Sequence, residues 1–267
     1  GCNYMIFLQH EKGWDNMLTK TRQKEILKLL ENRGSVTLQE LKDHLNTSES
    51  TIRRDLNTLD AQGKLVKVFG GAVAADNMSI RDEQVSRREE KNLEEKRLIA
   101  RYAASLIQDD DFVYLDAGTT TGCMLDYISD TTTAVFVTNA PSHAQKLARK
   151  GMEVILIGGR LKQSTEAVVG EEACRQIEKF NFSLGFLGSN GVSERSGFST
   201  PDQDEAMVKK RAIERIHRCF VLCDHTKFYK VSPISFAKLE DAVVLTDSAP
   251  QGNFQEMPNI VEISEDE

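Results

Sequence analysis

The chain has 267 residues, a length typical of one large domain or two ordinary ones. Its 34 lysines and arginines against 41 aspartates and glutamates give a formal net charge of -7, with 40% apolar and 28% charged residues. This composition excludes a disordered chain, a collagen-like repeat and a coiled-coil rod, and the acidic average by itself argues against a nucleic-acid-binding protein.

No apolar run approaches the roughly 20 residues that span a bilayer, so we expect no membrane partner. The five cysteines are odd in number and scattered, without a secretory signal, so we expect a cytoplasmic protein. Cys219 and Cys223 alternate in an apolar strand-like run and are expected as buried residues; we expect neither a metal nor a cofactor. Residues 1–16 have no helical or strand period. We interpret them as an extra N-terminal segment, a candidate for a non-native extension before Met17.

Residues 17–75 have the pattern of a winged helix-turn-helix. Apolar residues at helical spacing predict three successive short helices, the second ending near Leu45 and the third beginning after the N-cap residue Ser48. An alternation over 64–68, followed by a turn at Gly70-Gly71, predicts a hairpin after the third helix.

The third helix predicts what this module binds. Ile52, Leu56 and Leu59 define its buried face, and the opposite face carries polar and basic side chains near the N-terminus. Such side chains suit base edges and phosphates. We expect DNA contacts from Ser50, Thr51, Arg53 and Arg54 in the helix and from Lys64 and Lys67 in the wing. The alternative is an ordinary solvated helix in which one arginine pairs with Asp55 or Asp60.

Residues 76–92 are polar and charged and predict a linker, followed by an effector and oligomerisation domain over 93–267. We predict strands over 112–116, 133–138, 153–157, 182–187, 218–223, 242–246 and 260–263. We predict helices from residue 94, over 121–128, 142–149, 170–178 and 203–216, and around 233–237. This alternation predicts an α/β domain with a mostly parallel, Rossmann-like sheet.

The predicted strands end in polar, glycine-rich loops, where parallel sheets bind ligands. The loop over 116–121 combines a glycine, threonine hydroxyls and a helix start, which favours phosphate. Without a Walker lysine it suits a sugar phosphate better than a nucleoside triphosphate. The candidate effector-binding residues are Asp116, Gly118, Thr119, Thr120, Thr121, Thr138, Asn139, Gly159, Arg160, Asn190, Gly191, Thr200, Glu205, Lys209 and Lys227. Each loop alone is as easily a turn or a cap, but together they are typical of a polar pocket.

Both halves resemble one known family. The run Ser-Thr-Ile-Arg-Arg-Asp-Leu over 50–56, with Gly-Gly-Ala over 70–72, strongly resembles the DNA-binding domain of the DeoR family of bacterial transcriptional repressors. The loops at 116–120 and 224–227 resemble the effector domain of that family, which shares its fold with ribose-5-phosphate isomerases. The resemblance implies a phosphorylated sugar as inducer, held by the threonine loop and Lys227. Members that respond to fructose 1-phosphate look most similar.

A single winged helix rarely supplies enough contacts for operator specificity, so we expect a homo-oligomer, dimer or tetramer, that reads half-sites of a double-stranded operator. We expect it to repress a sugar-utilisation operon until the sugar phosphate binds. The alternatives are an isomerase-like enzyme with a DNA-binding appendage, or a winged helix that binds protein. Isomerases of this fold carry acidic residues in the turn corresponding to 188–191, where Asn190 cannot act as a base. We therefore expect no enzymatic activity.

The net charge is unevenly distributed between these regions. Residues 17–74 hold 10 basic and 7 acidic side chains, whereas residues 75–267 hold 23 and 32. The acidic average therefore conceals a small basic module, and it no longer argues against DNA binding.

Overall fold

The computed structural model describes residues 18–30, 32–68, 70–74 and 85–265. The chain forms two compact units, whose boundary lies between residues 77 and 78. The first 16 residues, Met17 and residues 75–84 of the predicted linker lie outside the described residues. Within the described part, no helix has both the length and the apolarity that crossing a bilayer requires.

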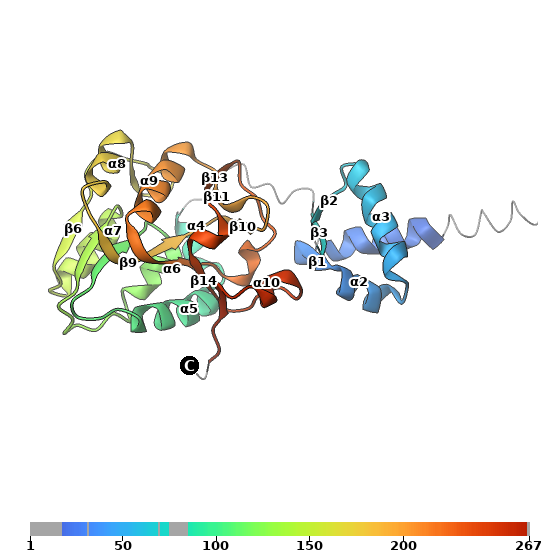
Figure 1. Ribbon diagram of the computed structural model, residues 1–267, viewed down its shortest axis with the longest axis horizontal. Helices are drawn as coiled ribbons and strands as arrows, with labels where there is room; N and C mark the ends of the chain where they lie inside the picture. Colours follow the sequence, from blue (N-terminus) through green and yellow to red (C-terminus); the bar gives the residue numbers. More distant parts are fainter. Residues whose placement is uncertain (1–17, 31, 69, 75–84, 266–267) are drawn as a thin grey trace, which may run out of the picture. The chain divides into compact units, whose positions relative to one another are not determined.

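The first unit is the predicted winged helix-turn-helix (Figure 1). Residues 18–30 are helical and are followed by β1 (Ser35–Thr37), α2 (Leu38–Leu45), α3 (Glu49–Ala61), β2 (Leu65–Val68) and β3 (Gly71–Ala74). The strands form an antiparallel sheet in the order β1-β3-β2. Residues 35–37 form a third strand because β3 supplies their pairing partner, with Val36 opposite Ala72.

The core of the first unit joins all of these elements. Ile26, Leu41, Ile52, Leu56 and Leu65 are at most 1% exposed and belong to one apolar cluster. The periodicity of α3 is therefore explained by burial, since its apolar face packs inward and its other face stays in water.

The second unit contains the predicted α/β domain. Its helices are α4 (Val85–Glu90), α5 (Leu93–Ser105), α6 (Thr119–Met124), α7 (Pro141–Arg149), α8 (Glu171–Ile177), α9 (Gln203–Glu214) and α10 (Asn253–Glu256), with short 3-10 helices η2 (His225–Lys227) and η3 (Leu239–Asp241). The main sheet contains β4 (Phe112–Leu115), β5 (Val135–Thr138), β6 (Val154–Leu156), β9 (Phe182–Gly188), β12 (Ile216–Leu222), β14 (Val243–Thr246) and β15 (Ile260–Glu262). The smaller sheets contain β7 (Arg160–Leu161) with β8 (Val168–Val169), and β10 (Gly191–Ser193) with β11 (Gly197–Thr200) and β13 (Ile234–Ala237).

All seven predicted strands are found in the main sheet, which is parallel throughout and has the order β15-β14-β12-β9-β4-β5-β6. Residues of α5, α6 and α7 share an apolar cluster with the sheet. In Figure 1, α8 and α9 lie together across the sheet from α5. Sheet order reverses between β4 and β9, and this switch point is where a parallel sheet opens a crevice for a ligand.

The predicted helix around 233–237 is wrong. Residues Ile234–Ala237 form strand β13, which pairs antiparallel with β11. Phe236 is 3% exposed, and the centroid of its ring lies 6.1 Å from that of Phe198. Packing on β11, which is distant in the sequence, thus decides the conformation of a segment too short to have a clear period of its own.

Candidate functional sites

Helix α3 begins at a well-formed cap. Ser48 Oγ accepts a hydrogen bond from the backbone N–H of Thr51 at 3.3 Å and lies 3.0 Å from Ser50 Oγ. The chain turns between α2 and α3, where Asn46, the C-cap residue of α2, has a φ of 46°. The start of α3 is therefore fixed in place, with the Ser50 side chain exposed beside it.

The predicted DNA-contacting arginines are both exposed. Arg53 Nη2 lies 2.7 Å from Glu49 Oε1, an i,i+4 pair on the helix surface with both side chains about half exposed. Arg54 is exposed; its carbonyl oxygen accepts from Thr58 Oγ1 at 3.0 Å, but its guanidinium has no hydrogen bond or ion pair to a described residue. Neither arginine pairs with Asp55 or Asp60, so that feature of the solvated-helix alternative is absent from the described residues.

Asp55 instead fastens α3 to the first helix. Its carboxylate is 2% exposed and accepts from Arg22 Nε and, at 3.2 Å, from Arg22 Nη2, with Gln23 Nε2 at 3.3 Å. In the wing, Lys64 is exposed, and Lys67 Nζ donates to Asn57 Oδ1 of α3 at 2.7 Å. Both predicted wing cations therefore lie on the surface, and Lys67 lies next to α3.

The second unit has a pocket at the switch point of its sheet. Asp116 directly follows β4 and is 2% exposed. Its Oδ2 accepts from the backbone N–H of Gly188, at the end of β9, at 3.0 Å and from Lys209 Nζ of α9. Lys209 Nζ also donates to the carbonyl oxygen of Gly188 at 3.0 Å. One buried ion pair thus joins β4, β9 and α9 at the floor of the pocket.

Nine of the fifteen predicted effector residues line this pocket, which we call the switch-point pocket. They are Asp116, Gly118, Thr119, Thr120, Asn139, Asn190, Glu205, Lys209 and Lys227. The sequence prediction that these strand ends meet at one place therefore matches their position in the fold.

The pocket carboxylates and amides are held by neighbours. Glu205 accepts from Thr165 Oγ1, and Lys162 Nζ lies 3.6 Å from it. Asn139 Nδ2 donates to the Val168 carbonyl oxygen at 3.1 Å. These contacts fix the orientation of polar groups that would otherwise rotate, which prepares them to select a ligand.

Six predicted effector residues do not line the pocket, and their contacts explain why. Thr121, Thr138 and Thr200 are fully buried. Thr121 Oγ1 donates to the Asp116 carbonyl oxygen at 2.7 Å, and Thr200 Oγ1 donates to Asn190 Oδ1 at 3.2 Å, so these hydroxyls bond within the protein. Arg160 lies in β7 with a 63% exposed side chain and pairs with Asp204. These four residues therefore lie outside the lining of the switch-point pocket.

The two remaining residues, Gly159 and Gly191, have backbone roles. A Cβ at Gly191 would lie 2.3 Å from the carbonyl oxygen of Lys230, and one at Gly159 would lie 2.9 Å from that of Val169. Gly191 thus permits the close approach of the loop that carries Lys230, which lines the pocket.

Sequence reasoning missed four basic residues of the pocket. Arg88 comes from α4, Lys91 from the turn after it, Lys96 from α5 and Lys230 from the loop after η2. The sequence contained one signal for them, the basic pair Arg87-Arg88, but this pair lies in the stretch that the charge pattern predicts as a linker. The lining also contains Glu205, Lys209 and Lys227, which are distant in the sequence, so no local pattern could place a linker residue in this pocket.

Three cations of the pocket, Arg88, Lys96 and Lys227, lie close to one another. Lys96 is 4% exposed, and its Nζ donates to the carbonyl oxygen of Arg88. Burial lowers the pKa of Lys96, with a further lowering by the positive charge of Lys227 and a partial compensation by Asp224. These groups are therefore near enough to one another for their charges to interact.

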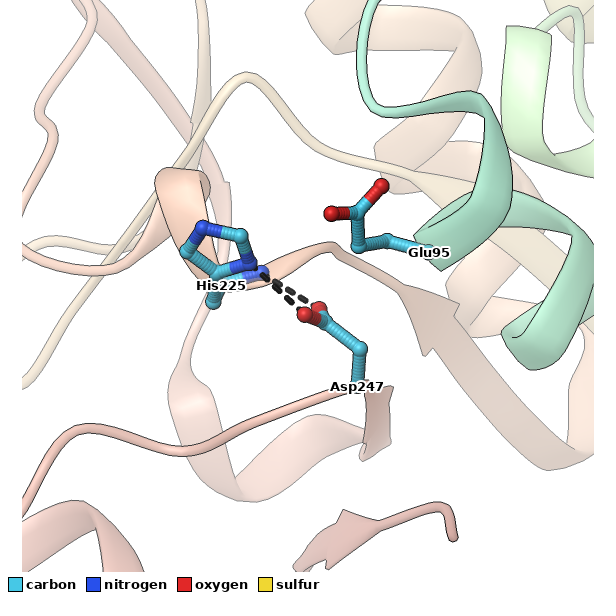
Figure 2. Close-up of side chains that lie close together, drawn as sticks. All are labelled: Glu95, His225 and Asp247. Carbon is cyan, nitrogen blue, oxygen red and sulfur yellow. Dashed lines mark hydrogen bonds and ion pairs between the residues drawn. The ribbon is translucent and has the colours of Figure 1, made fainter. Parts of the chain in front are cut away.

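Helix η2, which carries Lys227, is anchored from outside the pocket. Figure 2 shows His225 facing Asp247, with Glu95 of α5 close by. His225 Nδ1 and its backbone nitrogen each lie 2.7 Å from a carboxylate oxygen of Asp247. In the described part of the chain, these three are the residues whose ligand atoms lie near enough to share a metal ion, within 4.8 Å of one another. In the structure, the His225–Asp247 contact holds the turn that directs Lys227 into the pocket.

Two family descriptions match the two units in turn. Residues 22–78 match the DeoR-like helix-turn-helix domain, and residues 91–248 match the DeoR C terminal sensor domain. The chain is 40% identical over 243 residues to the uncharacterized HTH-type transcriptional regulator FruR of Bacillus subtilis, covering 90% of this chain and 96% of the relative. It is 33% identical over 247 residues to a lactose phosphotransferase system repressor of Staphylococcus aureus, covering 91% of this chain and 97% of the relative.

Among solved structures, ribose 5-phosphate isomerase A from Neisseria gonorrhoeae is 12% identical, with a TM-score of 0.38, over 51% of this chain and 53% of that chain. The isomerase from Methanocaldococcus jannaschii is 14% identical, with a TM-score of 0.40, over 52% of this chain and 56% of that chain. The chain thus spans little more than half the length of these isomerases. From the two family matches and the full-length relatives, the chain belongs to the DeoR family of transcriptional regulators.

Proposed function

We propose that the protein represses a sugar-utilisation operon in the cytoplasm and leaves its operator when a phosphorylated sugar binds the switch-point pocket. Fructose 1-phosphate is the first candidate effector, in line with the resemblance drawn from the sequence. The observation that carries the proposal is the charge of the pocket, whose lining holds five lysines and one arginine against three carboxylates. A pocket with this excess of positive charge favours an anionic ligand.

The distribution of these charges gives the ligand an orientation. Lys209 is paired with Asp116 at the floor, so its charge is largely compensated. The charge of Lys96 is compensated only in part by Asp224 and is repelled by that of Lys227, so we place the phosphate of the ligand beside these two lysines. The amide of Asn139 and the carboxylate of Glu205 are suited to sugar hydroxyls. Helix α6 has only six residues, so we assign the preference for an anion to these side chains and not to the helix start.

The DNA partner is proposed to be double-stranded operator DNA read by α3. Arg53 is held by an exposed pair with Glu49, a type of contact worth about 0.3–0.5 kcal/mol, which a phosphate or a guanine can replace. Arg54 is exposed beside it, and Ser50 and Thr51 stand at the start of the helix. Lys64 and Lys67 can reach flanking phosphates from the wing.

We also propose that the chain acts as a homo-oligomer through its second unit. A single winged helix supplies few base contacts, so an operator is commonly read by two copies. The edge strand β6 exposes Ile155 and Leu156, at 37% and 46%, and the nearby strand β7 exposes Leu161 at 57%. Parallel sheets are normally covered, so this apolar edge suits a second copy of the chain. A dimer or a tetramer would meet the requirement.

The proposed role is a switch and not an enzyme. Isomerisation requires a general base that can take a proton from the sugar, and the carboxylates of the pocket are the first candidates. Asp116 is held by Gly188 and Lys209, Glu205 by Thr165, and Asp224 by Thr226, whose N–H donates to it at 3.0 Å. The three pocket carboxylates are thus engaged in structural hydrogen bonds. Turnover of pentose or hexose phosphates, followed by NMR, would favour the enzyme alternative.

Thermal-shift measurements on the full chain would identify the effector. The panel should contain fructose 1-phosphate, fructose 6-phosphate, glucose 6-phosphate and unphosphorylated fructose. We expect stabilisation by one phosphate ester and none by fructose. Lys227→Ala should abolish this stabilisation, whereas Lys179→Ala, which removes an exposed lysine outside the pocket, should not.

Fluorescence anisotropy with DNA from the upstream region of the gene would test the repressor role. We expect specific binding that the stabilising sugar phosphate weakens. Arg53→Ala should lose operator binding while the sugar phosphate still raises the melting temperature. Lys227→Ala should bind the operator without responding to the sugar phosphate. Loss of both activities in both folded variants would contradict the proposed division of labour.

A further inference from the structure

Arg88 reaches the switch-point pocket from helix α4, the first described element after the winged helix-turn-helix. The last strand of the first unit, β3, ends at Ala74, and α4 begins at Val85. Arg88 belongs to the lining of the pocket. Its nitrogens Nε and Nη2 are buried and have no hydrogen-bond partner among the described residues.

These two nitrogens form the same edge of the guanidinium group. An arginine uses that edge to hold two oxygens of one phosphate or carboxylate at once. Leaving charged donors buried without a partner is costly, because they lose water and gain nothing in return. The arrangement therefore has the form of a binding group whose partner is an anion with two accessible oxygens.

The neighbouring charges favour the same kind of partner. Lys96 is buried, and the positive charges of Lys227 and Arg88 both lower its pKa, in addition to the effect of burial. Asp224 is the carboxylate that acts on Lys96 in the opposite direction. Three cations near one carboxylate repel one another, and a bound dianion would relieve that repulsion.

We propose that Arg88 binds the phosphate group of the effector with both nitrogens and thereby makes α4 the element that couples the pocket to the DNA-binding unit. This inference rests on the proposed function and adds to it a ligand and a route. The anionic group would lie between Arg88 and Lys227, whose side chains come from α4 and η2.

Within the second unit, helix α4 is already attached to α5 by the bond from Lys96 Nζ to the Arg88 carbonyl oxygen. A ligand held by the Arg88 side chain supplies a second attachment at the same residue. Along the chain, α4 directly precedes the sensor domain. Fixing α4 therefore limits the directions in which the chain can lead from it to the first unit, and we call these directions the paths of the chain. A ligand that favours one of these paths shifts the equilibrium away from the form that fits the operator.

The test uses the full chain and three variants, with fructose 1-phosphate and inorganic phosphate as probes. Arg88→Ala removes the binding edge, Arg88→Lys keeps the charge without the paired nitrogens, and Arg87→Ala removes the exposed arginine next to it on the same helix. Calorimetry measures affinity, anisotropy measures the ratio of operator affinities with and without the probe, and hydrogen exchange measures protection of residues 85–92.

We expect Arg88→Ala to weaken fructose 1-phosphate binding by about 10- to 100-fold, as loss of a charged, two-point contact implies. Arg88→Lys should fall between Arg88→Ala and the wild type, and Arg87→Ala should match the wild type. The ligand should protect residues 85–92 of the wild type from hydrogen exchange. Arg88→Ala, even at a ligand concentration that saturates it, should show neither this protection nor release from the operator.

Two results would overturn the inference in distinguishable ways. If Lys227→Ala loses binding but Arg88→Ala binds and responds like the wild type, the proposed function stands and the role of Arg88 is wrong. If the wild-type chain binds neither probe nor any sugar phosphate of the panel, the proposed function fails and this inference fails with it.

Discussion

Replacement of Asp55 by alanine should unfold the DNA-binding unit selectively. Asp55 is buried in α3 and accepts two hydrogen bonds from Arg22 and one from Gln23. Breaking a buried ion pair by removing one partner costs about 3–5 kcal/mol. The Arg22 side chain is 19% exposed, so water partly solvates it after the change, and we expect about 2–4 kcal/mol.

That loss is large for a unit of this size. A unit of about 60 residues has a stability of about 3–9 kcal/mol. Each kcal/mol lowers the melting temperature of such a unit by about 4–8 °C, so the unfolding transition of the first unit should move down by more than about 8 °C. Operator binding should weaken in proportion to the folded fraction, whereas the second unit, with its own core, should keep its transition and its sugar-phosphate response.

Differential scanning calorimetry of the full chain can separate these outcomes. Asp43→Ala is the matched control, because Asp43 is an exposed aspartate of α2 whose partner is Gln39, at 2.8 Å. It should cost less than about 0.5 kcal/mol. Asp55→Asn, which keeps an acceptor oxygen, should fall between the two. If Asp55→Ala is no more destabilising than Asp43→Ala, the pair with Arg22 does not hold the unit together.

Three further predictions concern pH, backbone space and capping. Burial lowers the pKa of His143 from 6.5 to about 4, so between these values the unfolded chain binds a proton that the folded chain does not. The free energy of unfolding should therefore fall by up to about 3 kcal/mol as the pH drops from 6.5 to 4. Denaturation measured across this range should show a smaller fall in His143→Gln and the wild-type fall in the exposed control His217→Gln. Gly191→Ala should displace the Lys230 loop, cost about 1–3 kcal/mol and weaken sugar-phosphate binding in the calorimeter, and unchanged binding would show that the loop adjusts freely. Ser48→Ala should cost about 1 kcal/mol by urea denaturation and weaken operator binding, because the start of α3 loses its cap; an unchanged midpoint would contradict this.

The sequence determined the features that are local in the chain. Ser48 with Ile52, Leu56 and Leu59 contains both the start and the buried face of α3 within one stretch, and the seven strands of the main sheet were each visible as short apolar runs. Polar loops after parallel strands meet at one edge by the geometry of the sheet, so the pocket followed from chain order and strand direction.

Only the tertiary structure decided which side chains meet across long separations. Asp55 had two plausible arginine neighbours on its own helix, yet its partner is Arg22 from another helix. Arg160 follows a strand end as Lys227 does, but β7 turns it toward Asp204 and solvent. Arg88 had the sequence pattern of a linker residue, and its place in the pocket depends on α4 packing beside α6 and on the bond from Lys96 of α5 to the Arg88 carbonyl oxygen. Periodicity records burial along one element, whereas these contacts depend on how separate elements pack, which no local pattern in the chain specifies.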